Sequence, residues 1–486
     1  MSEKFFKYKT PDDIRGNVRD LHLDVTFEEK LDAVFRPVKV GNRTIGNGMG
    51  IHPMEGCDGT LDGKPGELTL RRWRRFGEGG AKLIWGEATA VVPEGLANPR
   101  QLLINEGNLA SLEGMLKGAR NAHRAAFGSD GDLLIGLQLT HSGRYSYRRP
   151  LIAYRHPQVD AVTYLDKAKG IRIPKDYPML TDDELKRLED AFVLAAKRVS
   201  KIGFDFVDIK QCHTYLLNEL LGARTRDGEY GGSFENRTRF VRNVLGRIRD
   251  EVGNNMQLAS RLNVYDGVPF VKDPVSGVGV PLPYNLPYKY SFGVDPQDPL
   301  REDLTEPLHL IQLIRDLGVV LVNVSMGSPY YNMHYGRPFE RTPDEGYWPP
   351  EHPLVGVNRH FRVTGAVQKA FPDLAVVGTG YSWLRQFLLN AGESNIRRKR
   401  VSIVATGRGA IAYPEYAKDA MATGSMKPSK VCLAISYCTN LMRSKNNEMG
   451  QYPAGCVPRD EPYAEIYREV LDKKRKLAKP QPEAHS

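Results

Sequence analysis

Residues 207–240, VDIKQCHTYLLNELLGARTRDGEYGGSFENRTRF, decide how this chain folds. The stretch begins as a short β-branched run and continues into an amphipathic segment that favours a helix. Between the two lie Lys210, His213 and Tyr215, three side chains that bind or exchange protons. Polar side chains gathered where a strand gives way to a helix are typical of the reactive mouth of a barrel enzyme.

The same order of strand and helix recurs along the whole chain. The expected strands are 48–52, 81–87, 133–140, 204–210, 256–263, 319–325, 374–377 and 401–406. Helices are expected to follow them, among others at 67–78, 182–202, 235–252 and 360–370. Eight such units predict an α/β fold, a (β/α)8 TIM barrel.

Three segments lie outside these units. We expect an N-terminal extension at 1–33, the barrel at 34–426 and a short cysteine-containing C-terminal extension at 427–486. Within the barrel, the long loop 265–299 is typical of a lid or binding loop, and a plain surface insertion is the alternative. The connection 145–180 is a second long insertion.

Composition fits an enzyme that acts on small molecules. The 486 residues are 41% hydrophobic and 26% charged, and no apolar run reaches the roughly 18 residues of a membrane helix. The first residues lack the apolar centre of a signal peptide, so a cytoplasmic location is expected. The net charge of +10 comes from short, scattered basic runs without a binding module, which argues against nucleic acid as a partner. The oligomeric state stays open, with a homo-oligomer among the alternatives.

Glycines at the ends of the last two strands predict a phosphate site. Thr379 and Gly380 follow one strand, and Gly407 and Arg408 follow the next. Glycine lets backbone N–H groups approach an anion, and Arg408 adds a charged donor. Because barrels commonly bind phosphate at these two strand ends, a phosphate-bearing cofactor is expected.

The chain resembles the Old Yellow Enzyme family of FMN oxidoreductases over roughly residues 33–460. The family pattern is a strand, then HxxHxYL, then EYGGSxENR; His213, Tyr215 and residues 229–237 match it, whereas Lys210 replaces the first histidine. The resemblance implies a barrel that binds FMN, with NADH or NADPH as the reductant.

The resemblance also implies which other residues contact the flavin. Pro53 and Met54 lie in IHPMEG, Ala88 lies in GEATAVVPEG, and Gln138 lies in QLTHSGR. Gln138 offers both a donor and an acceptor to the pyrimidine edge of the flavin. Arg261 matches an arginine near flavin N1 and O2, where a cation stabilises the charge that develops on reduction.

Two positions depart from the family pattern. Glu55 stands where the family usually has Thr or Cys, so either its carboxylate points away from the flavin or the flavin potential is unusual. Lys210 is expected to polarise a carbonyl or hold a carboxylate, although it lacks the directional geometry of imidazole. The alternatives for Lys210 are that its side chain reaches solvent or that it pairs with Glu55.

The expected activity is that of an FMN-dependent ene-reductase. By the resemblance, Lys210 and His213 hold the carbonyl of an enone or enoate, and Tyr215 donates a proton. The first alternative is an FMN-dependent amine or N-methyl dehydrogenase, for which Tyr330 and Tyr331 would contribute an aromatic cage. The second is a non-catalytic basic barrel.

The cysteines decide between subfamilies. Five cysteines, at 57, 212, 432, 438 and 456, are too few and too uneven for a disulfide framework. Larger relatives carry CxxCxxxC and a fourth Cys that hold a 4Fe–4S cluster. Here Cys432, Cys438 and Cys456 are one thiolate short and differently spaced, so no iron–sulfur cluster and no other metal is expected. A three-cysteine zinc site is the alternative.

Overall fold

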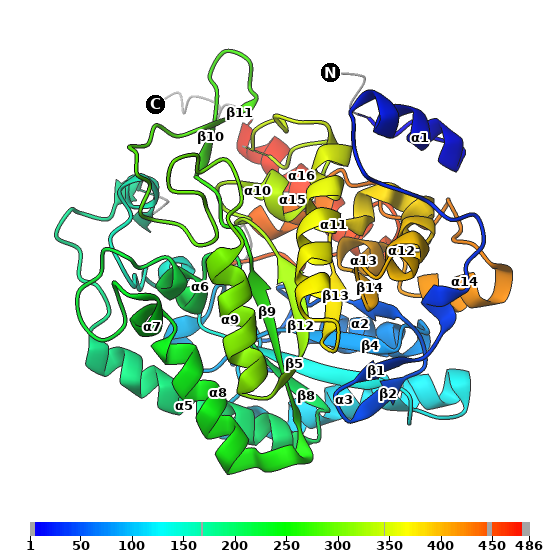
Figure 1. Cartoon of the computed structure of the whole chain (residues 1–486), viewed down its shortest axis with the longest axis horizontal. Coiled ribbons are helices and arrows are strands. Elements are labelled where there is room, and N and C mark those ends of the chain that lie inside the picture. Colours follow the sequence, from blue (N-terminus) through cyan, green and yellow to red (C-terminus); the bar gives the residue numbers. More distant parts are fainter. Residues whose placement is uncertain (1–4, 167–168, 345, 445–449, 479–486) are drawn as a thin grey trace, which may run out of the picture.

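A closed barrel of eight parallel strands forms the centre of the protein (Figure 1). The computed structural model describes residues 5–166, 169–344, 346–444 and 450–478. Around the barrel the strands follow the order β12, β13, β14, β3, β4, β5, β8 and β9. Their bounds are β3 (Met49–Ile51), β4 (Leu83–Ala90), β5 (Leu134–Thr140), β8 (Phe206–Ile209), β9 (Gln257–Asn263), β12 (Val319–Ser325), β13 (Ala375–Gly378) and β14 (Ile403–Thr406). The predicted TIM barrel is confirmed, and each strand overlaps its expected range.

The barrel strands are buried because both of their faces are covered. Parallel sheets of this kind read as continuous apolar runs, which is why the strands could be recognised in the sequence. One core cluster fills the barrel and includes Trp85 and Phe206, whose rings meet edge to face at 5.0 Å. The interior of the barrel is therefore packed, as is usual for this fold.

The outer helices pack around the strands (Figure 1). They are α2 (Glu67–Glu78), α3 (Leu109–Phe127), α5 (Asp182–Ile202), α8 (Arg239–Val252), α9 (Thr305–Asp316), α11 (Pro353–Ala370) and α12 (Leu388–Arg397). Helix α5 begins with a capping box between Thr181 and Glu184 and ends at Gly203, whose φ of 95° suits glycine. The ranges expected for α2 and α5 are confirmed to the residue.

Two expected helices differ in their bounds. The segment 235–252 is split at Thr238 into α7 (Phe234–Arg237) and α8, because Ser233 caps a separate short turn. Helix α11 begins at Pro353, seven residues before the expected start, since a proline is favoured in the first turn of a helix. In both cases capping residues near the helix start determine the boundary.

The remaining elements lie in loops and extensions. They are α1 (Pro11–Asp20), β1 (Val38–Val40), β2 (Arg43–Ile45), α4 (Pro157–Asp160), β6 (Tyr164–Asp166), β7 (Ile171–Arg172), α6 (Leu216–Leu221), β10 (Phe270–Lys272), β11 (Gly279–Pro281), α10 (Met333–Gly336), α13 (Arg408–Ala412), α14 (Tyr416–Thr423), α15 (Tyr437–Arg443) and α16 (Glu461–Ala478). The described residues contain six short 3₁₀ turns, of which the longest spans Tyr381–Phe387. No described helix is long and apolar enough to cross a membrane.

The two long insertions touch each other. The segment 145–180 follows β5 and contains the β6–β7 hairpin, and the loop 265–299 follows β9 and contains most of the β10–β11 hairpin. Gln158 joins them, because its Nε2 donates to the Pro283 carbonyl at 2.8 Å and its Oε1 accepts from the Tyr288 hydroxyl at 2.8 Å. Both insertions follow the carboxyl ends of strands, so they surround the mouth of the barrel.

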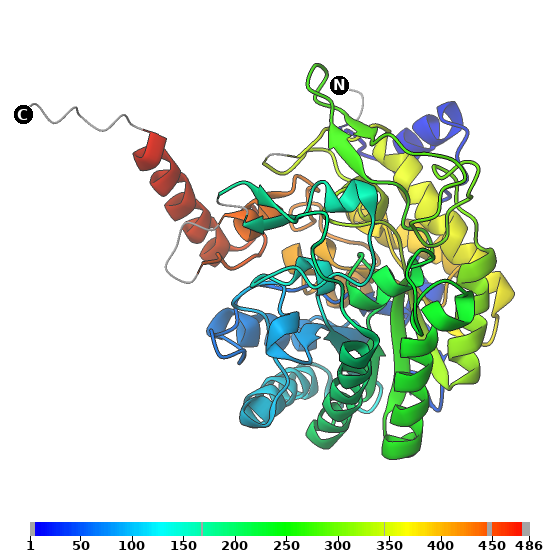
Figure 2. The same ribbon diagram turned by 90° about the vertical axis from the view of Figure 1, so that its left-hand side faces the viewer.

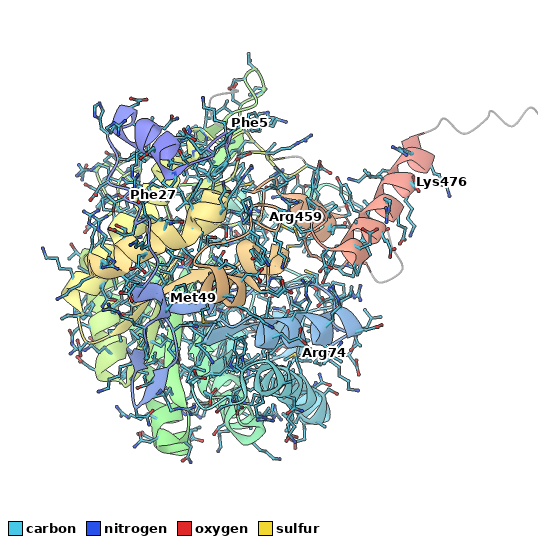
Figure 3. All side chains as sticks on the ribbon, turned by 90° about the vertical axis from the view of Figure 1, so that its right-hand side faces the viewer. Phe5, Phe27, Met49, Arg74, Arg459 and Lys476 are labelled. Atoms are coloured by element: carbon cyan, nitrogen blue, oxygen red, sulfur yellow. The ribbon has the colours of Figure 1, made fainter. Side chains whose placement is uncertain are left out.

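The C-terminal extension leaves the body as a projecting helix. Figure 2 shows α16 directed away from the barrel, and Figure 3 shows Lys476 near its far end and Arg459 close to the body. Asp460, just before α16, anchors this end to α2 through ion pairs with Arg71 at 2.7 Å and Arg75 at 2.8 Å. The extension is thus attached on the side of α2.

Candidate active site

Lys210, just after β8, points into the barrel mouth. The side chain is buried, with 5% of the residue exposed, and its Nζ lies 3.7 Å from the centre of the Tyr215 ring. Among the described residues no ion pair joins Lys210 and Glu55, although the charge of each shifts the pKa of the other, and the alternative of a lysine that reaches solvent is wrong. Burial lowers the pKa of Lys210. The aromatic face replaces part of the hydration that the ammonium has lost.

His213 is held by its neighbours in a strained turn. Its φ is 65° and that of Thr214 is 58°, a region that a β-branched residue seldom occupies. The hydrogen bond between His213 Nε2 and Ser325 Oγ, 3.2 Å long, fixes the ring against the end of β12. Burial, and then the charge of Arg261, hold the pKa of His213 well below its usual range. His213 is therefore a neutral imidazole whose second nitrogen, Nδ1, is free of this bond.

Tyr215 carries the phenolic hydroxyl that is nearest to Lys210 and His213 along the chain. Its OH lies 2.8 Å from the hydroxyl of Tyr330, in the loop after β12. Burial raises the pKa of Tyr215 well above its ordinary value, so the side chain stays protonated at neutral pH. Tyr145 stacks flat on Tyr330, with ring centres 3.6 Å apart and planes at 5°. The three predicted catalytic residues are thus together at one mouth.

Asp208 organises the strands below the catalytic residues, although the sequence reading did not identify it. Its Oδ2 accepts from Gln138 Nε2 at 2.6 Å and from Trp85 Nε1 at 2.7 Å. Its Oδ1 accepts the backbone N–H of Arg261 at 2.8 Å. Burial raises the pKa of Asp208 to about 6 in spite of these bonds. The available signal was a carboxylate inside an otherwise apolar strand, VDI.

The hydrogen bonds to Asp208 fix the position of the Gln138 amide and of the Arg261 backbone. One amide proton of Gln138 is used by Asp208, which leaves its carbonyl oxygen for an N–H donor. Arg261 is 6% exposed, its Nε has no partner, and among the described residues its guanidinium meets no carboxylate. Burial lowers the pKa of Arg261. A buried cation without a partner is costly, so this position calls for an anionic group.

Pro53, Met54 and Ala88 line the strand ends on the other side of the mouth. Pro53 and Met54 follow β3, and the Met54 sulfur lies 2.6 Å from where a Cβ on Gly407 would be. A side chain at position 407 would therefore have to displace the side chain of Met54. Ala88 lies in β4, pairs in register with Gln138, and is 5% exposed. The predicted flavin contacts from β3, β4 and β5 are therefore neighbours.

The predicted phosphate residues lie at the ends of β13 and β14. Gly380 has a φ of 94°, and a Cβ there would lie 2.7 Å from the His360 ring. The Thr379 hydroxyl donates to the Val324 carbonyl at 2.7 Å, so only its backbone faces a ligand. Arg408 donates through Nη2 to the Pro338 carbonyl at 2.8 Å, while its buried Nη1 has no partner. That unpaired donor fits the phosphate of FMN.

Arg337 adds a second guanidinium near this place and was missed. Burial, and then the charge of Arg408, lower the pKa of Arg337 to about 9. Its Nε is buried without a partner, and its Nη1 donates to Thr439 Oγ1 at 2.8 Å. The residue lies in a loop rather than at a strand end, and no sequence pattern marks it.

The three tail cysteines line one cavity together with Arg408. Cys432, Cys438 and Cys456 are free thiols. In the described part of the chain, no three His, Cys, Asp or Glu side chains are arranged to hold a metal ion. The absence of an iron–sulfur cluster and of zinc remains a prediction.

Glu55 is held by amides of the segment after β4. Its carboxylate accepts hydrogen bonds from Asn98 Nδ2 and, at 3.5 Å, from Gln101 Nε2. Burial raises the pKa of Glu55 to about 7, and Lys210 opposes that rise. These partners turn the carboxylate toward residues 98–101, and its direction relative to the flavin stays a prediction.

Comparison with known proteins identifies the family of this chain. Residues 33–275 match the NADH:flavin oxidoreductase / NADH oxidase family. An NADPH dehydrogenase from Clostridium acetobutylicum is 28% identical over 298 residues, which cover 61% of this chain and 74% of that protein.

Two solved structures share the fold. The complex of 2-naphthoyl-CoA reductase with 2-naphthoyl-CoA matches with a TM-score of 0.63 and 17% identity, over 89% of this chain and 58% of that one. An old yellow enzyme homologue from Zymomonas mobilis matches with a TM-score of 0.55 and 20% identity, over 82% of this chain and 95% of that one. The resemblance seen in the sequence is confirmed: the chain belongs to the NADH:flavin oxidoreductase / NADH oxidase family, the family of the old yellow enzymes.

Proposed function

We propose that this protein is an FMN-dependent ene-reductase that uses NADH or NADPH to reduce an activated C=C bond in an enone or enoate. The observation that carries the proposal is the meeting of a buried ammonium, a neutral imidazole and a protonated phenol at one barrel mouth. Two of these groups suit a carbonyl oxygen, and the third suits proton donation to carbon.

The residues of the cofactor pocket fit FMN. When bound, FMN accepts hydride from a nicotinamide cofactor and delivers it to the alkene. Gln138 offers its carbonyl to the pyrimidine edge, and the unpaired Arg261 offers positive charge where reduction adds negative charge. Arg408 offers an unpaired buried N–H to the phosphate.

The substrate oxygen is bound by Lys210 and His213. Lys210 brings positive charge, and His213, whose Nε2 is engaged by Ser325, brings the directional contact. Both groups draw electron density from the conjugated alkene and so make its β carbon electrophilic. Tyr215, protonated because it is buried, gives its proton to the α carbon.

The amine or N-methyl dehydrogenase alternative is less favoured by the tyrosines at the mouth. An aromatic cage binds a cationic substrate through open ring faces. One face of Tyr215 is covered by Lys210 itself, and one face of Tyr145 lies against one face of Tyr330. The protein's own ammonium thus occupies the place of a cationic substrate, and a carbonyl or anionic substrate is the better complement.

A small-molecule substrate, without nucleic acid or a membrane, is part of this proposal. So is a cytoplasmic location, which the five free cysteines support. The chain covers only 58% of the naphthoyl-CoA reductase, so functions of the rest of that protein are not carried over.

The test is anaerobic reduction of the purified yellow protein, first with NADH and then with NADPH. The reduced protein is next mixed with a panel of enones, enoates and other electron acceptors, and the oxidised protein with tertiary amines. Rapid reoxidation by enones or enoates supports the proposal. Reduction by a tertiary amine together with inertness to every alkene would favour the dehydrogenase, and a colourless protein that binds no flavin on reconstitution would favour the non-catalytic barrel.

A further inference from the structure

The hydroxyl of Tyr215 has one recorded partner among the described residues, the hydroxyl of Tyr330. The two oxygens lie 2.8 Å apart, a normal distance for a hydrogen bond between hydroxyl groups. Only 7% of Tyr215 is exposed, whereas 42% of Tyr330 is exposed. The buried phenol is therefore hydrogen-bonded to a residue that reaches the protein surface, although burial around the Tyr330 hydroxyl raises the pKa of that group as well.

We propose that Tyr330 is a proton-relay residue that returns a solvent proton to Tyr215 in each turnover. The inference rests on the proposed function, in which Tyr215 protonates the substrate. The Tyr215 O–H bond breaks as the C–H bond at the α carbon forms. In the same step the Tyr330 O–H bond breaks and the Tyr215 O–H bond is restored, and a water-borne proton then restores Tyr330. One solvent proton is consumed for each hydride delivered, and the relay changes no oxidation state.

Such a relay is needed because Tyr215 is a poor place for a lasting negative charge. A buried phenolate loses its hydration, and an isolated ionised group in an apolar site is strongly disfavoured. The ammonium of Lys210, 3.7 Å from the ring centre, stabilises a transient phenolate at Tyr215 but does not remove its charge. Transfer along an existing hydrogen bond removes the charge without moving either ring.

Tyr330 is held firmly enough to act in this way. Its ring stacks on Tyr145 at 3.6 Å, and its backbone N–H donates to Ser328 Oγ at 3.3 Å. Ser328 Oγ in turn lies 3.0 Å from Thr214 Oγ1, which joins the loop after β12 to the loop after β8. The two hydroxyl groups are therefore held within hydrogen-bonding distance, although 115 residues separate the two tyrosines in the chain.

The test compares Tyr330→Phe with Tyr331→Phe in the holoenzyme. Both changes remove one hydroxyl from the same loop, but Tyr331 is not bonded to Tyr215. Tyr330→Phe keeps the ring that stacks on Tyr145 and should slow reoxidation by an enone on the order of 10-fold, less than the roughly 10²–10⁴-fold expected for loss of the donor itself. Reduction by the nicotinamide cofactor should be unchanged in both variants.

Proton inventories in mixtures of H₂O and D₂O give a readout that a structural role would not move. The unaltered enzyme should give a curved plot, because two protons move, and Tyr330→Phe should give a straight line with a smaller isotope effect. A spectrum of the apoprotein labelled with ¹³Cζ tyrosine gives a readout without turnover. The resonance lost in Tyr215→Phe should shift in Tyr330→Phe and stay in place in Tyr331→Phe.

The outcomes separate this inference from the proposed function. Slow reoxidation in Tyr215→Phe with an unchanged rate and isotope effect in Tyr330→Phe overturns the relay and leaves the ene-reductase standing. An unchanged rate of reoxidation in Tyr215→Phe would overturn both the role of Tyr215 as proton donor and the relay. Equal slowing of reoxidation in Tyr330→Phe and Tyr331→Phe would also overturn the relay, because it would show a general disturbance of the loop after β12 rather than loss of the hydrogen bond to Tyr215.

Discussion

The ammonium nitrogen of Lys210 lies 3.7 Å from the centre of the Tyr215 ring, so the charged catalytic candidate and the proposed proton donor are in direct contact. The contact covers one face of the ring and holds a positive charge beside the substrate position. It links the choice of substrate to proton transfer, because a change at either residue alters the surroundings of the other.

Lys210→Met should weaken the binding of anionic ligands, and Lys210→His should shift preference toward neutral enones. Contacts assisted by charge are roughly twice as strong as neutral ones. The measurement is a titration of the flavin spectrum with a series of phenolates and with a matched enoate and enone. Equal dissociation constants in all three proteins would show that Lys210 does not contact the ligand.

Tyr215→Phe should leave reduction by the nicotinamide cofactor nearly intact and slow reoxidation by an enone by about 10²–10⁴-fold. Stopped-flow measurement of the two half-reactions separates these effects. The change also removes the hydrogen bond to Tyr330 while it keeps the ring under Lys210. If both half-reactions keep their rates, another group or water donates the proton.

The purified protein should carry one non-covalent FMN, and Arg408→Ala should weaken its retention. A buried phosphate that loses its charged partner costs about 2–5 kcal/mol. FMN release is followed by fluorescence after dilution. Arg408→Lys keeps the charge but loses the planar guanidinium, so its FMN retention should lie between that of the unaltered protein and that of Arg408→Ala. Recovery of FAD, or of a protein that binds no flavin on reconstitution, would contradict the cofactor assignment.

Anaerobically prepared protein should contain neither iron nor acid-labile sulfide at a stoichiometric level. Three cysteine side chains line the cavity beside Arg408, and a cluster with four thiolate ligands needs one more. Elemental analysis for iron and zinc, with a sulfide assay, checks this expectation. Stoichiometric iron with broad absorbance beyond the flavin bands would contradict it, and stoichiometric zinc would favour the three-cysteine alternative.

Asp208→Asn should change how the stability of the apoprotein depends on pH. The pKa of Asp208 is about 6 in the folded protein, above its ordinary 3.8, so the folded state keeps a proton that the unfolded state has released. The stability contributed by this group is therefore full below pH 3.8 and falls as pH rises to about 6. Urea unfolding across that interval should show this fall in the unaltered protein and not in Asp208→Asn. Parallel curves for the two proteins would be the contrary result.

The sequence by itself determined the barrel. Strands covered on both faces need continuous apolar runs, and helices need one apolar stripe, so eight units could be counted before any contact was known. The expected range of α5, 182–202, is confirmed, and its ends coincide with a capping box at Thr181 and a left-handed Gly203, which are local features of the chain. His213 and Tyr215 could also be assigned, since the pattern that carries them is continuous in the chain.

Only the tertiary structure decided what these side chains touch. Asp208 collects hydrogen bonds from β4, β5 and β9, and Tyr330 meets Tyr215 across 115 residues. Lys210 rests on Tyr215 instead of pairing with Glu55. The direction of a buried long side chain depends on the packing of strands and loops that are distant in sequence, and local patterns carry no information about that packing.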